Sequence, residues 1–296
     1  MYETYSAKRF LWLLALDVVI FSICSVFFLI AKEMFFSSAQ EKNDEAPISL
    51  PVIMYHSVYG EQPSEYIVTP NQLESDLKWL KSNGYTSVSA KELIDYTQND
   101  GELPEKPVLI TLDDGHYNNL SVLLPLLEKY DMCAVVSVVG SYTERLAYND
   151  SHNDKYSYLT WEDISALIDS ERIEIGNHTY DMHSFNGVRK GCSKLAGESE
   201  EEYRNILMSD LLLLQNEIKN KTGISPYIFA YPFGYISRES LPVIRECGFL
   251  VTLTCYEKMN YITRNPDSLL GLNRYNRSGF YSTEEYMRML TREKEA

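Results

Sequence analysis

Seven short apolar runs, separated by segments with helical periodicity, constrain the fold of this chain more than any other feature. Alternation of this kind favours a parallel sheet with helices packed outside it. A chain of 296 residues is long enough for one α/β barrel domain of about 240 residues. The predicted strands cover residues 51–55, 107–112, 133–139, 172–177, 227–231, 249–254 and 269–273.

Two of the intervening helices carry clear boundary signals. Residues 71–83 place three leucines on one stripe, with Thr69 as a candidate N-cap and Pro70 at the first helical position. Residues 200–221 form the longest helical pattern, which ends before Gly223. These boundaries support the alternation of strands and helices.

Two adjacent carboxylates follow the predicted strand 107–112. The side chains of Asp113 and Asp114 point in different directions, so one can bind a metal while the other handles a proton. Asp-Asp-Gly is also ordinary turn chemistry, and a helix-capping turn is the simpler interpretation of the pair alone. Further ligands are needed before the pair indicates a metal site.

Two of the five histidines supply such ligands. His178 and His183 follow the predicted strand 172–177, and neutral imidazoles commonly accompany a carboxylate at a catalytic metal. Five residues turn through about 500° along a helix, so a loop is expected to carry both rings. A lone histidine is usually a surface or core residue, but this pair favours a metal. His116 and His152 are expected to be ordinary rim or loop residues.

A third apolar run, residues 228–234, turns over at Pro232 and Gly234. Such a turn can present a backbone N–H to a developing oxyanion. A plain strand-to-helix turn fits the same residues equally well.

In this order, the segments resemble the motifs of the polysaccharide deacetylase (NodB-homology) family, carbohydrate esterase family four. Residues 111–115 are similar to its first motif, residues 178–183 to the second and residues 231–234 to the third. Residues 52–56 resemble the first strand of a membrane-anchored branch that includes poly-N-acetylglucosamine deacetylases. The resemblance covers about residues 52–280 and implies an α/β fold, a distorted barrel of about seven parallel strands.

The resemblance also implies a metal centre. Asp114, His178 and His183 would ligate a divalent metal, above all Zn²⁺, with Co²⁺, Ni²⁺ or Fe²⁺ as alternatives. Asp113 would be the general base for the attacking water.

Other positions of the family's motifs would serve the substrate, an N-acetylated glycan such as peptidoglycan or poly-N-acetylglucosamine. The backbone N–H of Phe233 would help to hold the tetrahedral oxyanion before acetate and a free amine are released. Three residues would contact the sugar: Tyr180, Tyr231 and Pro232.

Two positions depart from the family's pattern. An Arg that orients the base usually opens the third motif, but Ala230 stands there, so Arg274 is the candidate replacement. Many members take the general acid from a late histidine, and none follows His183. Acid help is therefore expected from His56, from a proton on Asp113 or from solvent. His56 ends a predicted strand, where a structural hydrogen bond is an equal alternative.

The N-terminal segment predicts a single-pass membrane anchor. Residues 10–31 are mostly apolar, broken only by Asp17, and can cross a hydrocarbon core of about 30 Å. Two basic residues precede them, so residues 1–9 are expected in the cytoplasm and the catalytic domain, 51–296, outside. Residues 32–50 would be a linker. The apolar length favours a retained anchor over a cleaved signal.

The charge of the chain narrows its partners. The formal net charge is −15, and acidic and basic side chains balance within residues 1–40, so the expected outer part holds all of it. Phosphate binding needs the opposite sign, so nucleic acid is not expected as a ligand. Solubility explains most of this charge. The oligomeric state stays open.

Four cysteines lie outside the apolar span, without CxxC spacing: Cys133, Cys192, Cys247 and Cys255. An outer location permits disulfides, and Cys247 with Cys255 is one candidate pair, although sequence does not fix the pairing.

Three other functions fit parts of the pattern. A phosphoryl- or glycosyltransferase can hold Mg²⁺ or Mn²⁺ with acids after a strand, but it would not need His178 and His183. A membrane-tethered glycan-binding protein without activity is suggested by Ala230 and by the missing late histidine. A metal-dependent O-acetyl esterase would use the same centre.

Overall fold

The computed structural model describes residues 46–146, 152–185 and 188–292, together with 12, 16, 20–21, 24–28 and 32. The chain divides into two units, Met1–Ala46 and Pro47–Ala296. Most of the predicted anchor, residues 10–31, lies outside the described residues. Among the residues that are described, no helix combines the length and the apolar character needed to span a bilayer.

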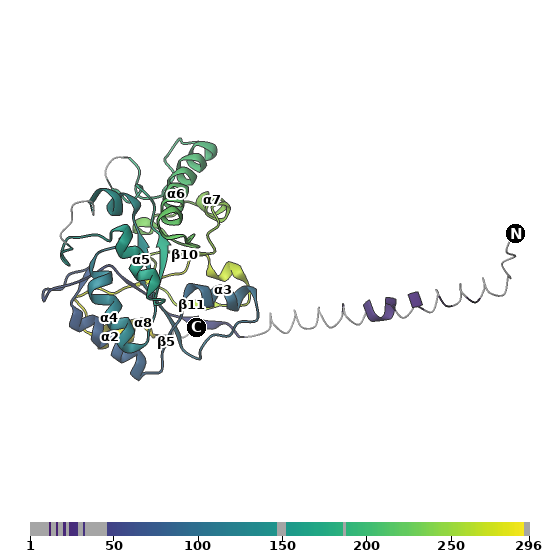
Figure 1. The fold of residues 1–296 in the computed structure, drawn as a ribbon, viewed down its shortest axis with the longest axis horizontal. Helices are drawn as coiled ribbons and strands as arrows, with labels where there is room; N and C mark the ends of the chain where they lie inside the picture. Colours follow the sequence, from purple (N-terminus) through teal and green to yellow (C-terminus); the bar gives the residue numbers. More distant parts are fainter. Residues whose placement is uncertain are drawn as a thin grey trace. The chain divides into compact units, whose positions relative to one another are not determined.

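The second unit is built on a curled sheet of parallel strands, seven of which form a continuous path in the described residues (Figure 1). The path runs β10–β9–β8–β7–β6–β2–β12, and β5 pairs with the start of β6. Bounds in chain order are β2 Val52–Tyr55, β5 Thr86–Ser87, β6 Pro107–Leu112, β7 Ala134–Val138, β8 Ile173–Asn177, β9 Ile228–Ala230, β10 Val251–Leu253 and β12 Tyr275–Asn276. Six of the seven predicted strands are confirmed to within about two residues.

The last predicted strand is misplaced. A 3₁₀ turn, Pro266–Leu269, occupies the start of the expected range because the Asn265 side chain accepts a hydrogen bond from the Asp267 amide. The chain then bridges to β10 at Leu272 and reaches β2 only at β12. This segment links the two ends of the sheet path and gives the sheet its barrel-like curl.

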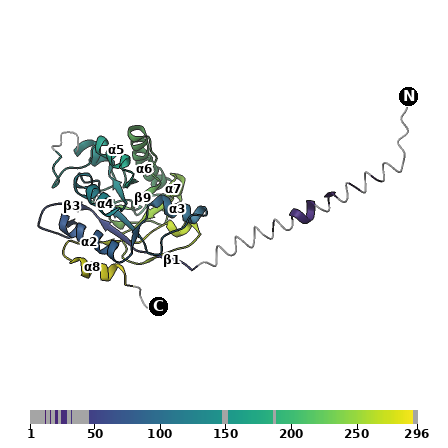
Figure 2. The same ribbon diagram turned by 60° about the horizontal axis from the view of Figure 1, so that its bottom comes forward.

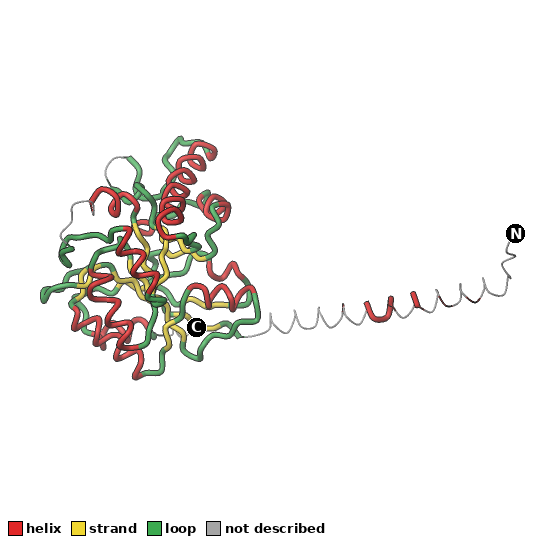
Figure 3. Tube along the Cα trace, viewed as in Figure 1, coloured by secondary structure: helices red, strands yellow, loops and turns green. Residues whose placement is uncertain are grey.

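Helices cover the outside of the sheet (Figure 3). They are α2 Pro70–Ser82, α3 Ala90–Gln98, α4 Leu124–Tyr130, α5 Trp161–Asp169, α6 Glu200–Thr222, α7 Ser240–Glu246 and α8 Thr283–Leu290. The predicted Thr69 cap and the Gly223 end of α6 are both confirmed. In the turned view, α2 and α8 run side by side (Figure 2). Two small pairings flank the main sheet: β1 Ile48–Leu50 with β11 Asn260–Ile262, and β3 Ser57–Val58 with β4 Ile67–Val68.

The core follows the alternation of side chains along the strands. All six residues of β6 are buried, as expected for a parallel strand covered on both faces. Ile110 belongs to the cluster packed against α2, α4, α5 and α8, whereas its neighbour Leu109 belongs to the cluster with α3, β1 and β11. Each strand is therefore held from both sides, and the loops at its carboxyl end start from fixed positions.

Candidate metal centre and active site

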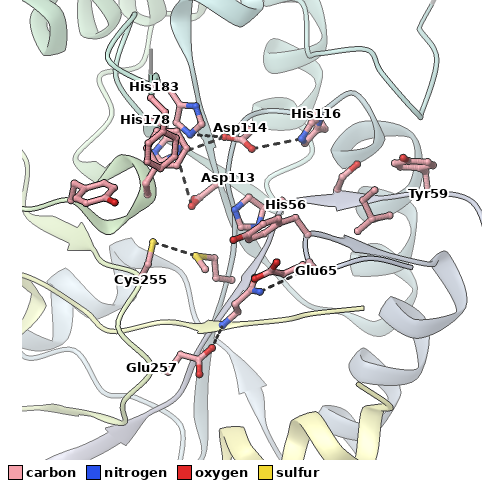
Figure 4. Close-up of a pocket in the computed structure, with 18 of the residues that line it drawn as sticks. His56, Tyr59, Glu65, Asp113, Asp114, His116, His178, His183, Cys255 and Glu257 are labelled. Atoms are coloured by element: carbon pink, nitrogen blue, oxygen red, sulfur yellow. Dashed lines mark hydrogen bonds and ion pairs between the residues drawn. The ribbon is translucent and has the colours of Figure 1, made fainter. Parts of the chain in front are cut away.

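The carboxyl ends of neighbouring parallel strands carry most of the predicted site residues. Asp113 and Asp114 follow β6, His178 follows β8, and His56 follows β2. Because parallel strands end at the same edge of a sheet, these side chains meet although more than 100 residues separate the first from the last. Figure 4 shows them around one cavity.

Asp114, His178 and His183 form a cluster in which one atom of each lies within 4.8 Å of the others. The Asp114 Oδ1 oxygen is 3.2 Å from His183 Nε2 and 3.8 Å from His178 Nε2. This oxygen is buried and has no hydrogen-bond partner among the described residues. A buried carboxylate oxygen without a partner, facing two imidazole nitrogens, fits a divalent cation with positions left for water.

The outer nitrogens of both rings are held in place. His178 Nδ1 lies 2.8 Å from the carbonyl oxygen of Ala230, and His183 Nδ1 lies 2.9 Å from the hydroxyl of Tyr142. These contacts orient the rings so that their Nε2 atoms face Asp114. Burial, helped by the nearby His178, lowers the pKa of His183 to about 4. Its ring is therefore neutral at physiological pH, the form that binds metals.

Asp113 is held by Arg274. Two parallel hydrogen bonds join them, from Nη1 to Oδ1 at 2.8 Å and from Nη2 to Oδ2 at 2.7 Å. Arg274 is itself fully buried and donates from Nε to the carbonyl oxygen of Thr254. Burial alone raises the pKa of Asp113, but the Arg274 charge, with His178, outweighs it and holds that pKa well below its usual range. Asp113 is therefore ionised throughout the physiological range.

His56 lines the same cavity, next to both carboxylates. Its Nδ1 atom is buried and has no hydrogen-bond partner in the part of the chain that is described. The ring meets Tyr66 edge-on, with the two centroids 4.9 Å apart. Burial lowers the pKa of His56, while Asp114 and Asp113 act in the opposite direction. The ring nitrogen thus remains available, and the structural hydrogen bond weighed above is not observed at Nδ1.

Three non-glycine residues at the strand ends adopt left-handed backbone conformations. The φ angles are 73° at Asp114, 74° at Thr179 and 57° at Phe233. Such conformations carry local strain, which the surrounding structure must offset, and they often gather at functional sites. The Phe233 ring packs over His183 at 4.3 Å between centroids, so its backbone turns at the edge of the cluster.

The three predicted sugar contacts, Tyr180, Tyr231 and Pro232, are not among the described residues that line this cavity. Tyr231 shares a strand face with Phe229, packs on it, and its hydroxyl lies 2.9 Å from Ser240 Oγ. Tyr180 donates to Glu144 at 2.6 Å, and Pro232 is buried. The alternation of side chains at the end of β9 turns Tyr231 toward the helices.

His116 and Cys255 line the cavity although no role was expected for them. His116 Nε2 is 3.8 Å from Asp114 Oδ2, and its ring stacks on Tyr158. The described cysteines are all free thiols, so the suggested pairing of Cys255 with Cys247 is wrong. Cys255 instead faces Arg274, because the chain after β10 turns back into the site. In the sequence, only the position of Cys255 shortly after a predicted strand could have indicated that it lies in the site.

The cavity has a volume of about 610 Å³ and is partly open to solvent. Aromatic rings and the carboxylates of two glutamates surround the cluster of Asp114, His178 and His183, a lining that suits a sugar with its ring faces and hydroxyl groups. These residues are Tyr59, Tyr66, Phe185, Phe233, Tyr235, Glu65 and Glu257.

Comparisons with known proteins point to one family. The family model described as polysaccharide deacetylase matches residues 100–252. A poly-beta-1,6-N-acetyl-D-glucosamine N-deacetylase of Escherichia coli (strain K12) is 23% identical over an alignment of 219 residues, and the match covers 67% of this chain and 32% of that protein. The putative polysaccharide deacetylase YxkH of Bacillus subtilis (strain 168) is 28% identical over 71% of this chain and 66% of its own length. The chain thus spans about one third and two thirds of these relatives.

The fold also matches solved structures. A Streptococcus pyogenes deacetylase, PplD, in complex with acetate superposes with a TM-score of 0.67 at 20% identity. The match covers 83% of this chain and 100% of that one. The curled α/β sheet is therefore shared.

Proposed function

This chain belongs to the polysaccharide deacetylase family, and we propose that it is a metal-dependent hydrolase that removes N-acetyl groups from an amino-sugar polymer. One observation carries the proposal. The unpartnered Asp114 oxygen faces His178 and His183, and a second carboxylate, Asp113, is fixed beside them by Arg274. This is the set of groups that amide hydrolysis by an activated water needs.

The residues divide the reaction between them. A divalent cation held by Asp114, His178 and His183 would activate water and polarise the acetamide carbonyl. Asp113, whose Oδ2 is 4.0 Å from His178 Nε2, takes a proton from the water as its oxygen bonds to the carbonyl carbon. The backbone N–H of Phe233 supports the oxyanion.

Breakage of the C–N bond then requires a proton for the leaving nitrogen. His56 is the side chain best placed to relay a proton, because its ring lines the cavity beside both carboxylates. The proton is the one that Asp113 took from the water. Asp113 passes it to the leaving nitrogen, directly or through the His56 ring, so protons balance overall. The products are acetate and a free amine on the sugar.

We infer Zn²⁺ as the metal, because two imidazoles and one carboxylate form a typical zinc set; Co²⁺, Ni²⁺ and Fe²⁺ suit the same ligands. The name of the Escherichia coli relative and the aromatic lining support poly-N-acetylglucosamine, with peptidoglycan as the second substrate. We also propose that residues 10–31 anchor the chain in a cell membrane, with the sheet domain outside the cytoplasm, on the strength of their apolar sequence.

The test is acetate release, followed by mass spectrometry, from N-acetylated glucosamine oligomers and peptidoglycan fragments with the full chain and added Zn²⁺. Asp113→Asn is the control, because it removes the base while all three metal-ligand side chains remain. We expect turnover by the wild-type chain, a loss of at least about 100-fold in the variant, and equal metal content.

Other results would replace the proposal. Release only from O-acetylated glycans would identify an esterase. Binding without release from any polymer would indicate a glycan-binding protein. Metal binding that survives His183→Ala would contradict the ligand set.

A further inference from the structure

The two imidazoles of the proposed metal centre lie at opposite ends of one short loop, residues 178–183. The relative position of His178 and His183 therefore depends on what holds the residues between them. His178 is buried directly after β8, whereas His183 is five residues farther from the sheet. A small change in the loop would move His183 away from Asp114, from which its Nε2 is now 3.2 Å distant.

Helix α6 holds the middle of this loop through one carboxylate. Asp210 Oδ1 accepts a hydrogen bond of 2.7 Å from the amide of Tyr180, and Oδ2 accepts one of 2.9 Å from the amide of Asp181. Both oxygens are used, each on one of two consecutive amides. The side chain thus binds the backbone itself and does not depend on which side chains the loop carries.

A second contact joins the loop to the next residue of the helix. Asn177 donates from Nδ2 to the carbonyl oxygen of Leu211 at 3.1 Å. Its Oδ1 accepts from the amide of Thr179 at 2.8 Å, where φ is 74°. Asn177 is fully buried, so this bond is shielded from water. Two adjacent residues of α6 therefore fix three consecutive loop amides, directly or through Asn177.

The opposite side of the loop is held by the turn Tyr142–Leu146. Tyr142 contacts His183, and Glu144 accepts from the Tyr180 hydroxyl at 2.6 Å. On this side the amides of Gly140 and Ser141 also donate to the carbonyl oxygens of Thr179 and Tyr180, at 3.1 and 2.7 Å. The loop carbonyls are thus held from the 140s side, whereas Asp210 holds the loop amides from α6.

Only a carboxylate makes both backbone bonds. Asparagine has one acceptor oxygen, and its NH₂ group would face the second amide donor to donor. Burial raises the pKa of Asp210 to about 6, with the nearby Asp181 acting in the same direction and the two amide bonds against it. Near pH 7 the charged form that accepts both bonds prevails. Burial beside the negative charge of Asp181 destabilises the ionised Asp210 side chain. The two hydrogen bonds from the loop amides offset this cost.

We propose that Asp210 is a positioning residue of the metal centre, which sets metal affinity by holding the loop between His178 and His183. The inference rests on the proposed function, since it requires those histidines to be ligands. Residues that orient metal ligands typically change metal affinity by about 10- to 100-fold when they are replaced. We expect a loss of that size in Asp210→Asn.

The experiment measures Zn²⁺ affinity of the full chain by competition with a chromophoric chelator, together with kcat and KM at saturating Zn²⁺. Asp210→Asn should bind Zn²⁺ about 10- to 100-fold more weakly. Asp169→Asn, the same change at the exposed end of α5, should match the wild type. Asp210→Glu keeps a carboxylate and should bind Zn²⁺ more tightly than Asp210→Asn. At saturating Zn²⁺, KM should stay near the wild-type value, because Asp210 does not line the cavity.

Several outcomes overturn the inference. If Asp210→Asn binds Zn²⁺ within twofold of Asp169→Asn, while the wild-type chain binds metal and releases acetate, the positioning role of Asp210 is rejected. The proposed function is then unaffected. A wild-type chain that binds no Zn²⁺ or releases no acetate rejects the proposed function instead. Should Asp210→Asn fail to fold by circular dichroism, the comparison passes to Asp210→Ala, which removes both acceptor oxygens. Zn²⁺ affinity of Asp210→Ala equal to that of the wild type contradicts the inference, and weaker affinity supports it.

Discussion

Arg274 supplies the positive charge that pairs with Asp113, which Ala230 cannot supply. Ala230, at the end of β9, has no charge to offer, while Arg274 directly precedes β12, which lies on the other side of β6 in the sheet order, and reaches the carboxylate from there. Its two parallel hydrogen bonds fix the direction of the carboxylate as well as its charge. Arg274 and Asp113 are both buried, and each neutralises the charge of the other. Removing either side chain would leave an uncompensated charge in the interior.

Arg274→Gln should shift the pH dependence of catalysis. Without the guanidinium charge, burial dominates and the pKa of Asp113 rises from its depressed value. The base works only when ionised, so activity is lost as the pH falls through that pKa. The acid limb of kcat/KM should therefore move to higher pH and the maximal rate should fall. Arg245→Gln, in an exposed ion pair with Asp267, is the control.

The measurement is kcat/KM between pH 4 and pH 9 at saturating Zn²⁺. An acid limb at the wild-type position in Arg274→Gln would show that Asp113 does not depend on this arginine.

Most described helices of this domain begin where the sequence supplies a reciprocal cap, with α4 and α7 as the exceptions. Five of the described helices start after a Ser or Thr whose side chain accepts a hydrogen bond from the amide of the third helical residue. The side chain of that third residue accepts a hydrogen bond from the amide of the Ser or Thr in return. These helices are α2, α3, α5, α6 and α8. At α2 the cap also reaches outward. Gln72 donates to the carbonyl oxygen of Gly279, 207 residues away. A local signal is thus joined to the C-terminal part of the domain.

Thr69→Ala should lower the free energy of unfolding by about 1 kcal/mol, because it removes the oxygen that accepts from the Gln72 amide. Lys78→Ala, on the exposed face of the same helix, removes more atoms and should change stability by less than about 0.5 kcal/mol. Both values follow from urea titrations monitored by circular dichroism. Equal effects of the two substitutions would mean that the cap adds nothing specific.

Across the whole domain, Asp76 ties together segments that are more than 200 residues apart. This buried carboxylate on α2 accepts from Arg277 Nε at 2.7 Å, from the hydroxyl of Tyr55 at 2.9 Å and from Thr283 Oγ1 at 2.6 Å. Strand β2, helix α2, the chain after β12 and helix α8 meet at this one side chain. Because both Asp76 and Arg277 are fully buried, loss of one leaves an uncompensated charge in the core.

Arg277→Met and Asp76→Leu should each lower the free energy of unfolding by about 3–5 kcal/mol. The double substitution should lose clearly less than the sum, because no buried charge then remains unpaired. The exposed pair of Arg204 and Glu246 serves as the reference, with an effect below about 1 kcal/mol. Chemical denaturation of all variants measures the coupling. Strict additivity at the buried pair would contradict this account.

The local features of the fold follow from the sequence alone. The pattern of apolar residues reflects burial of positions that are close in the chain, so six of the strands were predictable. Helix boundaries depend on residues within about one turn of each other, so the start of α2 and the end of α6 were predictable too. Motif order also placed Asp113, Asp114 and His178 at strand ends. The last strand was not predictable in this way, because its position depends on pairing with β10 and β2.

Side-chain direction at the site was decided by tertiary structure. Tyr231 and Tyr180 turn away from the cavity and His116 turns into it, because strand register and helix packing set those directions. The two carboxyl-oxygen bonds of Asp210 likewise require α6 to lie against the loop of residues 178–183. The sequence by itself determined which chemical groups the site contains and at which edge of the sheet they stand. Which of them touch was decided only by packing, since contacts between distant segments have no local pattern in the chain.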